Sequence, residues 1–306
     1  MTRNTATLVG FVAILLWALL ALLTTASGNV PPFQLAAITF AIGGAIGMLR
    51  WAFKPSRIRT LRQPVSIWIL GIVGLFGYHF AYFTALRNAP PVEASLIAFL
   101  WPLLIVLFSA LLPGERIRLH HVFGAILGLS GAALIVTKGT LADFQIQYTY
   151  GYVMALACAL IWSGYSVLSR KVAHIPTDVV TGFCLMTSVL AFIAHLILEN
   201  TVWPSSTGEW FATVGLGLGP VGLAFYVWDY GVKHGDIQVL GAASYLAPLL
   251  STMILVAAGF AELTFIIIVA CLLITGGAAI AAKDLIFKGR QSNPDNSSAL
   301  LNKSEE

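Results

Sequence analysis

Apolar residues occur in long runs along the chain, and short gaps that contain charged residues, Pro or Asn separate these runs. A helix needs roughly 20 apolar residues to cross the hydrocarbon core of a membrane. The pattern therefore predicts an all-α polytopic membrane protein with ten transmembrane helices. We place them at residues 6–26, 33–52, 66–86, 91–112, 119–137, 150–169, 178–198, 210–231, 238–259 and 263–284.

Composition supports lipid as the solvent for most of the chain. Hydrophobic residues make up 58% of the sequence and charged residues only 10%, whereas a soluble domain carries roughly 25% charged residues. The net charge of +4 lies in the gaps between apolar runs, which argues against a nucleic-acid partner. Cys158, Cys184 and Cys271 all lie inside apolar runs, so we expect buried thiols rather than a disulfide or a metal site, and no cofactor.

The gaps alternate in positive charge. Every Lys and Arg except Arg87 and Lys138 lies in one alternate set of gaps or near the two ends of the chain. Cytoplasmic loops attract Lys and Arg, so we expect both termini in the cytoplasm, which ten spans allow. Residues 289–306 are polar and predict a disordered cytoplasmic tail.

The sequence contains an internal repeat. Trp17 recurs as Trp162, 145 positions later, and Pro102 recurs as Pro248, 146 positions later. Further matches in this register are Pro31 with Pro176, Pro102-Leu103-Leu104 with Pro248-Leu249-Leu250, and Gly131-Ala132-Ala133 with Gly277-Ala278-Ala279. Such periodic matches are the sequence signature of a duplicated unit.

The repeat divides the predicted spans into two halves of five, at residues 1–138 and 139–288. Because each half crosses the membrane an odd number of times, the second half must enter from the opposite side. Inverted repeats are typical of transporters, in which two like halves open a central site to either side. A duplicated channel or scaffold remains an alternative.

Several aromatic residues fall near the middle of their predicted spans. Trp and Tyr normally collect at the membrane interfaces, so those at mid-depth need polar partners, which a hydrated cavity supplies. Packing against a neighbouring carbonyl is the alternative. The candidate substrate-binding residues of this central cavity are Trp17, Tyr78, His79, Tyr82, Trp101, Trp162, Ser244 and Tyr245.

Two prolines at equivalent positions predict helix kinks. Pro102 and Pro248 lack the N–H that continues a helix and free carbonyls one turn upstream, so we predict hinges there. Pro220 predicts a bend in the eighth span, without a counterpart proline in the first half.

Ionisable residues inside membrane spans are functional candidates. His79 lies well inside the third span, where it either contacts a substrate carboxylate or a proton, or is a neutral core residue. Asp229 lies one turn before Lys233, which predicts a local ion pair. His195 and Glu93 lie near outer ends of spans, where we expect water to reach them.

The chain resembles the EamA-type repeat of the drug/metabolite transporter superfamily. The resemblance rests on the segment from Tyr82 to Ser95, which leads into Trp101-Pro102-Leu103-Leu104, then Pro113-Gly114-Glu115-Arg116-Ile117, and a Gly-rich last span with Gly124, Gly128 and Gly131. The second copy is looser and lacks the Arg after Glu262. The resemblance implies a ten-helix basket in the bacterial inner membrane.

The resemblance also implies export of amino acids, aromatic and other neutral ones, and of related metabolites. We expect a monomeric secondary transporter that works by alternating access and binds small molecules and lipid. The alternatives are an exporter of drugs or other metabolites and a receptor or scaffold without transport. An intramembrane enzyme would need paired His, Asp or Glu at helical spacing, and the only close pair, His120-His121, lies among basic residues, so we predict no enzyme.

Overall fold

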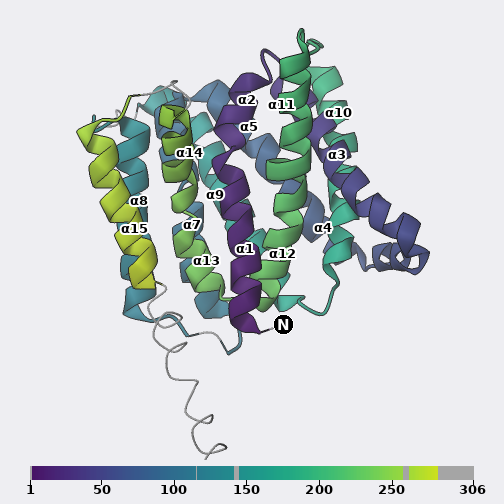
Figure 1. Ribbon diagram of the computed structural model, residues 1–306, viewed down its shortest axis with the longest axis horizontal. Coiled ribbons are helices and arrows are strands. Elements are labelled where there is room, and N and C mark those ends of the chain that lie inside the picture. The colour runs from purple at the N-terminus through teal and green to yellow at the C-terminus, as the bar shows by residue number, and fades with distance from the viewer. Residues whose placement is uncertain (1, 115, 141–144, 258–261, 282–306) are drawn as a thin grey trace, which may run out of the picture.

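The computed structural model describes residues 2–114, 116–140, 145–257 and 262–281, and within these ranges every regular element is a helix (Figure 1). Nine described helices are long and apolar enough to cross a membrane, and a shorter apolar helix, Phe265–Ala281, follows them. They correspond in order to the ten predicted spans, so the all-α multi-pass prediction is confirmed. The tail at 289–306 and Glu115 lie outside the described residues.

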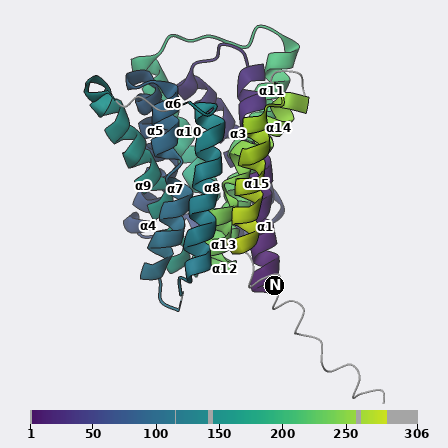
Figure 2. The same cartoon turned by 90° about the vertical axis from the view of Figure 1, so that its left-hand side faces the viewer.

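The helices run side by side in one bundle (Figures 1 and 2). An α-helix satisfies its backbone hydrogen bonds within its own segment, as lipid requires. The helices are α1 Arg3–Ala18, α2 Leu20–Ala26, α3 Pro32–Phe53, α4 Val65–Ile72, α5 Tyr78–Asn88, α6 Pro91–Ala98, α7 Trp101–Phe108, α8 Leu119–Thr137, α9 Thr149–Lys171, α10 Val180–Leu198, α11 Thr207–Leu218, α12 Ala224–His234, α13 Ile237–Ala243, α14 Leu246–Ala257 and α15 Phe265–Ala281.

The repeat extends to the irregularities of the backbone. A π-helical turn, Val73–Gly77, precedes α5, and a second one, Gly219–Leu223, precedes α12 at the same displacement of 146 positions. The bend expected at Pro220 is therefore present. It does have a structural counterpart in the first half, although that counterpart contains no proline. Gly74 lets the Tyr165 ring pack against the first turn, because that ring occupies the space that a Cβ would need.

Equivalent helices of the two halves run in opposite directions. Arg3, at the start of α1, donates a hydrogen bond to Asp236 at 3.1 Å. Arg170, near the end of α9, donates to the carbonyl of Gly235 at 2.8 Å. The start of α1 and the end of its counterpart α9 thus lie at the same end of the bundle, as inverted halves require.

Two spans are broken near the predicted hinges. Helix α6 ends at Ala98 and α7 begins at Trp101, while α13 ends at Ala243 and α14 begins at Leu246. Pro102 lies in the first turn of α7 and Pro248 in the first turn of α14. Each break therefore lies just upstream of its proline, where the missing N–H interrupts the ladder.

The two breaks are joined by a hydrogen bond. The hydroxyl of the fully buried Tyr245 donates to the carbonyl of Phe99 at 3.1 Å. The backbone of Leu103, one turn beyond Phe99, hydrogen-bonds to the same hydroxyl. Tyr245 thus supplies a hydrogen-bond partner to backbone groups at the helix break of the other half, which lipid could not do.

Glu199 connects three helices at the end of the bundle opposite the N-terminus. Its carboxylate accepts hydrogen bonds from the backbone N–H groups of Phe33 and Gln34, each at 3.1 Å, and so caps the start of α3. It also accepts from Arg87 at 2.6 Å and bonds the ring of His195 at 3.0 Å. Helices α3, α5 and α10 are therefore fixed to one buried carboxylate.

Two ionisable residues are less exposed than expected. His195 is 2% exposed, and its two ring nitrogens bond Glu199 and Thr201. Glu93 is 8% exposed, and its Oε2 has no hydrogen-bond partner. Both residues lie at helix ends, as expected, but neighbouring segments cover them, which hydropathy alone does not reveal. The predicted pair of Asp229 and Lys233 is present at 2.8 Å.

Replacing Glu199 with Ala should destabilise the protein by about 2 to 3 kcal/mol. The substitution removes a helix cap and a hydrogen-bonded carboxylate, and leaves buried donors without partners. The half-exposed Arg87 adds less because water screens it. Thermal unfolding in detergent measures the loss, with the exposed Glu262→Ala variant as control. Equal melting temperatures for the two variants would show that the network does not hold these helices.

Candidate functional site

Four tryptophans from both halves form a ring cluster inside the bundle. Trp17 of α1 lies 5.1 Å from Trp228 of α12, 5.8 Å from Trp162 of α9 and 6.2 Å from Trp101 of α7, measured between ring centroids. Trp101 and Trp162 are a further 6.3 Å apart and meet edge to face. These separations and tilts are those that aromatic rings prefer.

Three side chains of α5 extend this cluster. The rings of Tyr78 and Tyr82 are stacked, with planes 2° apart, and Tyr78 lies 5.4 Å from Trp162. The ring of His79 lies 5.0 Å from Phe40 and 6.3 Å from Phe225. Six of the eight predicted binding residues therefore come together around the four tryptophans.

The π-helical turns provide carbonyls to this cluster. His79 Nδ1 lies 2.7 Å from the carbonyl of Leu75 in the first π turn. Trp17 Nε1 donates to the carbonyl of Pro220 in the second π turn at 3.1 Å. π turns often occur at functional sites. Here the first turn orients His79, which follows it in the same span, and the second turn orients Trp17 of α1.

Ser244 and Tyr245 lie at the helix break and not among these rings. The Ser244 hydroxyl donates to the carbonyl of Leu240 at 2.7 Å. Tyr245 belongs to a separate apolar cluster and packs on Gly128, where its ring leaves no room for a Cβ. Both residues are almost fully buried. Both lie in the ninth predicted span, but the sequence could not show which side of the helix they occupy.

The ring cluster lies on the approximate symmetry axis that relates the two halves. A residue contacts its own counterpart only close to such an axis. Trp17 contacts Trp162, and His79 contacts Phe225. Phe99 accepts the hydrogen bond of its counterpart Tyr245. Residues of both halves therefore meet at these rings.

Trp228 and Phe225 were not predicted from the sequence. Trp228 is fully buried, and its Nε1 donates to the Ser166 hydroxyl at 3.1 Å. Both residues follow from the repeat register, because displacement by 146 positions takes Tyr82 to Trp228 and His79 to Phe225. Applying the register to every candidate, and not only to matching residues, would have found them.

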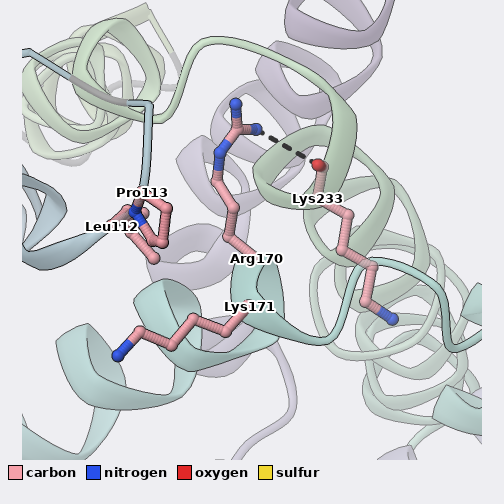
Figure 3. Close-up of a pocket in the computed structure, with 5 residues that line it drawn as sticks. All are labelled: Leu112, Pro113, Arg170, Lys171 and Lys233. Atoms are coloured by element: carbon pink, nitrogen blue, oxygen red, sulfur yellow. Dashed lines mark hydrogen bonds between the residues drawn. The ribbon is translucent and has the colours of Figure 1, made fainter.

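Two cavities are described away from the rings, and none of the predicted binding residues lines either one. The larger, about 390 Å³, is lined by Leu112, Pro113, Arg170, Lys171 and Lys233. In Figure 3 the Arg170 side chain is directed toward the backbone of Lys233, to which it donates at 3.1 Å, and the ammonium of Lys171 points away. Arg170 thereby ties α9 to the end of α12.

Several known proteins similar to this chain are named as exporters. The chain is 55% identical over 282 residues to the aromatic amino acid exporter YddG of Ancylobacter novellus, which covers 92% of this chain and 98% of the relative. It is 25% identical over 291 residues to the aromatic amino acid exporter YddG of Escherichia coli, with 92% and 97% covered. A crystal structure of 55% identity superimposes with a TM-score of 0.87 and covers 92% of this chain and 98% of that one.

The family comparison also reproduces the repeat. The profile of the EamA-like transporter family matches residues 4–137 and, a second time, residues 149–282. The two matches together include nearly all of the described helices. This chain belongs to the EamA-like transporter family.

Proposed function

We propose that the protein exports aromatic and other neutral amino acids from the bacterial cytoplasm across the inner membrane, with both termini cytoplasmic. The observation that carries the proposal is the 55% identity, over almost the whole chain, to an aromatic amino acid exporter. The ring cluster on the axis between inverted halves supports it, because alternating access requires a site that both halves share.

The chemistry of the ring cluster suits such substrates. Aromatic and aliphatic side chains would lie against Trp101, Trp162 and Tyr78. Only the bond to Leu75 is described for the His79 ring, so its Nε2 is available to the charged backbone of an amino acid. The Tyr82 hydroxyl, which bonds the Ser95 side chain, would exchange that partner for the substrate. Apolar contacts discriminate weakly between similar groups, so we expect broad selectivity.

The two halves, residues 1–138 and 139–288, would move relative to each other within one monomer. The hinges are the paired breaks before Pro102 and Pro248. The buried acid next to Trp228, Asp229, is held in an ion pair with Lys233 at 2.8 Å, so transport would be driven by the amino acid gradient. Related metabolites and drugs are the alternative cargo.

Purified protein in sealed liposomes should transport labelled phenylalanine, threonine and methionine in a saturable way, and should not transport a sugar phosphate. A pH gradient should leave the rates unchanged, because the buried acid beside the rings, Asp229, is held in an ion pair with Lys233. Empty liposomes are the control. Absence of any amino acid flux would reject the substrate assignment, and flux that follows the pH gradient would reject the facilitative mechanism.

Replacing Trp101 with Ala should lower phenylalanine flux about ten-fold, while the protein still folds. The substitution removes one wall of the ring cluster. A ten-fold loss of rate corresponds to about 1.4 kcal/mol. The matched control is Trp203→Ala, since Trp203 is 60% exposed and lies in a loop away from the cluster. Equal flux for the two variants would remove Trp101 from the substrate pathway.

Replacing Tyr245 with Phe should change the maximal rate of transport about three- to five-fold and leave the half-saturation concentration unchanged. The hydroxyl that joins the two helix breaks is lost, and a hydrogen bond contributes about 1 kcal/mol. Tyr82→Phe is the matched comparison, because its hydroxyl lies at the cluster and its loss should raise the half-saturation concentration. A raised half-saturation concentration for Tyr245→Phe would place Tyr245 in the binding site.

A further inference from the structure

A second cavity, separate from the ring cluster, opens between α3 and α10. Its volume is about 250 Å³, and it lies at the end of the bundle where Glu199 caps α3. Most of its wall is apolar, from Ala37, Ile38 and Ala41 on α3 and Phe192 on α10. Phe192 is 53% exposed, so the cavity is open at the outer surface of the bundle, which the membrane surrounds.

Gln34 lines the cavity and carries one unused hydrogen-bond donor. Gln34 is 4% exposed, and its Oε1 accepts a hydrogen bond from the backbone N–H of Val202 at 3.0 Å. Its Nε2 is buried and has no partner. A buried donor without an acceptor costs about 1 to 3 kcal/mol, so a ligand with an acceptor group at this position would be stabilised.

The other polar groups of the cavity are already engaged. The two ring nitrogens of His195 bond Glu199 and Thr201. The Ser188 hydroxyl donates to the carbonyl of Ala37 at 2.7 Å. An amino acid would bring a carboxylate and an ammonium group, and no free charged side chain lines this cavity to meet them. The cavity therefore suits a long apolar ligand with a neutral acceptor.

The depth of Gln34 matches the interface of the membrane. Gln34 lies in the first turn of α3, and Trp203, which is exposed, lines the same cavity. Trp203 stacks on Trp210 with ring centroids 6.0 Å apart. Exposed tryptophans collect at the level of the lipid headgroups. The ester carbonyls of phospholipids lie just below that level.

We propose that this cavity is a binding site for one phospholipid of the surrounding membrane. One acyl chain lies along Ala37, Ala41 and Phe192, and an ester carbonyl accepts the hydrogen bond of Gln34 Nε2. A cavity filled by water alone is less favourable here. Its apolar wall offers few partners, and each water needs two to four of them.

Photolabelling tests the site directly. The full-length protein is reconstituted in liposomes of phosphatidylethanolamine and phosphatidylglycerol that contain a trace of phosphatidylethanolamine with a diazirine in one acyl chain. After illumination, labelled peptides are identified by mass spectrometry. Labelling of residues 34–41 and 188–203 should exceed, by about five-fold, that of the segment around Phe211, which is 74% exposed at the same end of the bundle.

Two variants and one control separate the site from general contact with lipid. Ala41→Trp fills the cavity and should reduce labelling to the level around Phe211. Gln34→Leu removes the donor and should reduce labelling about five-fold, the equivalent of one hydrogen bond. Ile193→Trp, at an exposed position of α10 that does not line the cavity, should leave labelling unchanged.

The proposal is rejected if wild-type labelling of the cavity segments equals that around Phe211, since the cavity would then hold water or nothing. It is also rejected if Ala41→Trp is labelled as strongly as the wild type and the control Ile193→Trp. The comparison within the wild-type protein does not depend on the folding of any variant. Melting temperatures of the three variants show whether a loss of labelling reflects the site and not unfolding.

Discussion

The absence of water in the hydrocarbon core is the constraint on which this structure depends. Every irregular turn inside the bundle leaves backbone groups that lipid cannot satisfy. Three such places have a protein side chain as partner instead. The Tyr245 hydroxyl bonds the break at Phe99, His79 bonds Leu75, and the Trp17 indole bonds Pro220. The polar atoms of mid-membrane aromatic residues therefore hold the backbone irregularities as well as forming the central cluster.

Most of the fold was predictable from hydropathy and the repeat. The ten apolar runs, their division into two halves and the breaks before Pro102 and Pro248 all follow from local residue properties, namely length, polarity and the missing proline N–H. The π turn at Val73–Gly77 was not predictable, because no proline marks it and glycine alone is common in membrane helices. The turn packs against the ring of Tyr165, which is distant in sequence.

The positions of the candidate residues along their spans were predictable, but the helix faces that they occupy were not. Counting along a span gives the height of a residue in the membrane, and six predicted residues do meet around the tryptophans. The same count cannot show which helix face is inward once a span is broken, which is why Tyr245 lies among α8 side chains. Likewise, the burial of His195 depends on Glu199 and Thr201, which belong to a loop whose path hydropathy does not determine.

The hydrogen bond between Tyr245 and Phe99 is directional, because the hydroxyl of one half donates and the carbonyl of the other half accepts. In a dimer of identical subunits the axis position would hold the same side chain twice. Two phenylalanines would then leave both carbonyls without a hydroxyl donor. Joining the halves in one chain allows a donor on one side and an acceptor on the other. The fused chain can therefore stabilise its axis with complementary residues, a solution that symmetric assembly forbids.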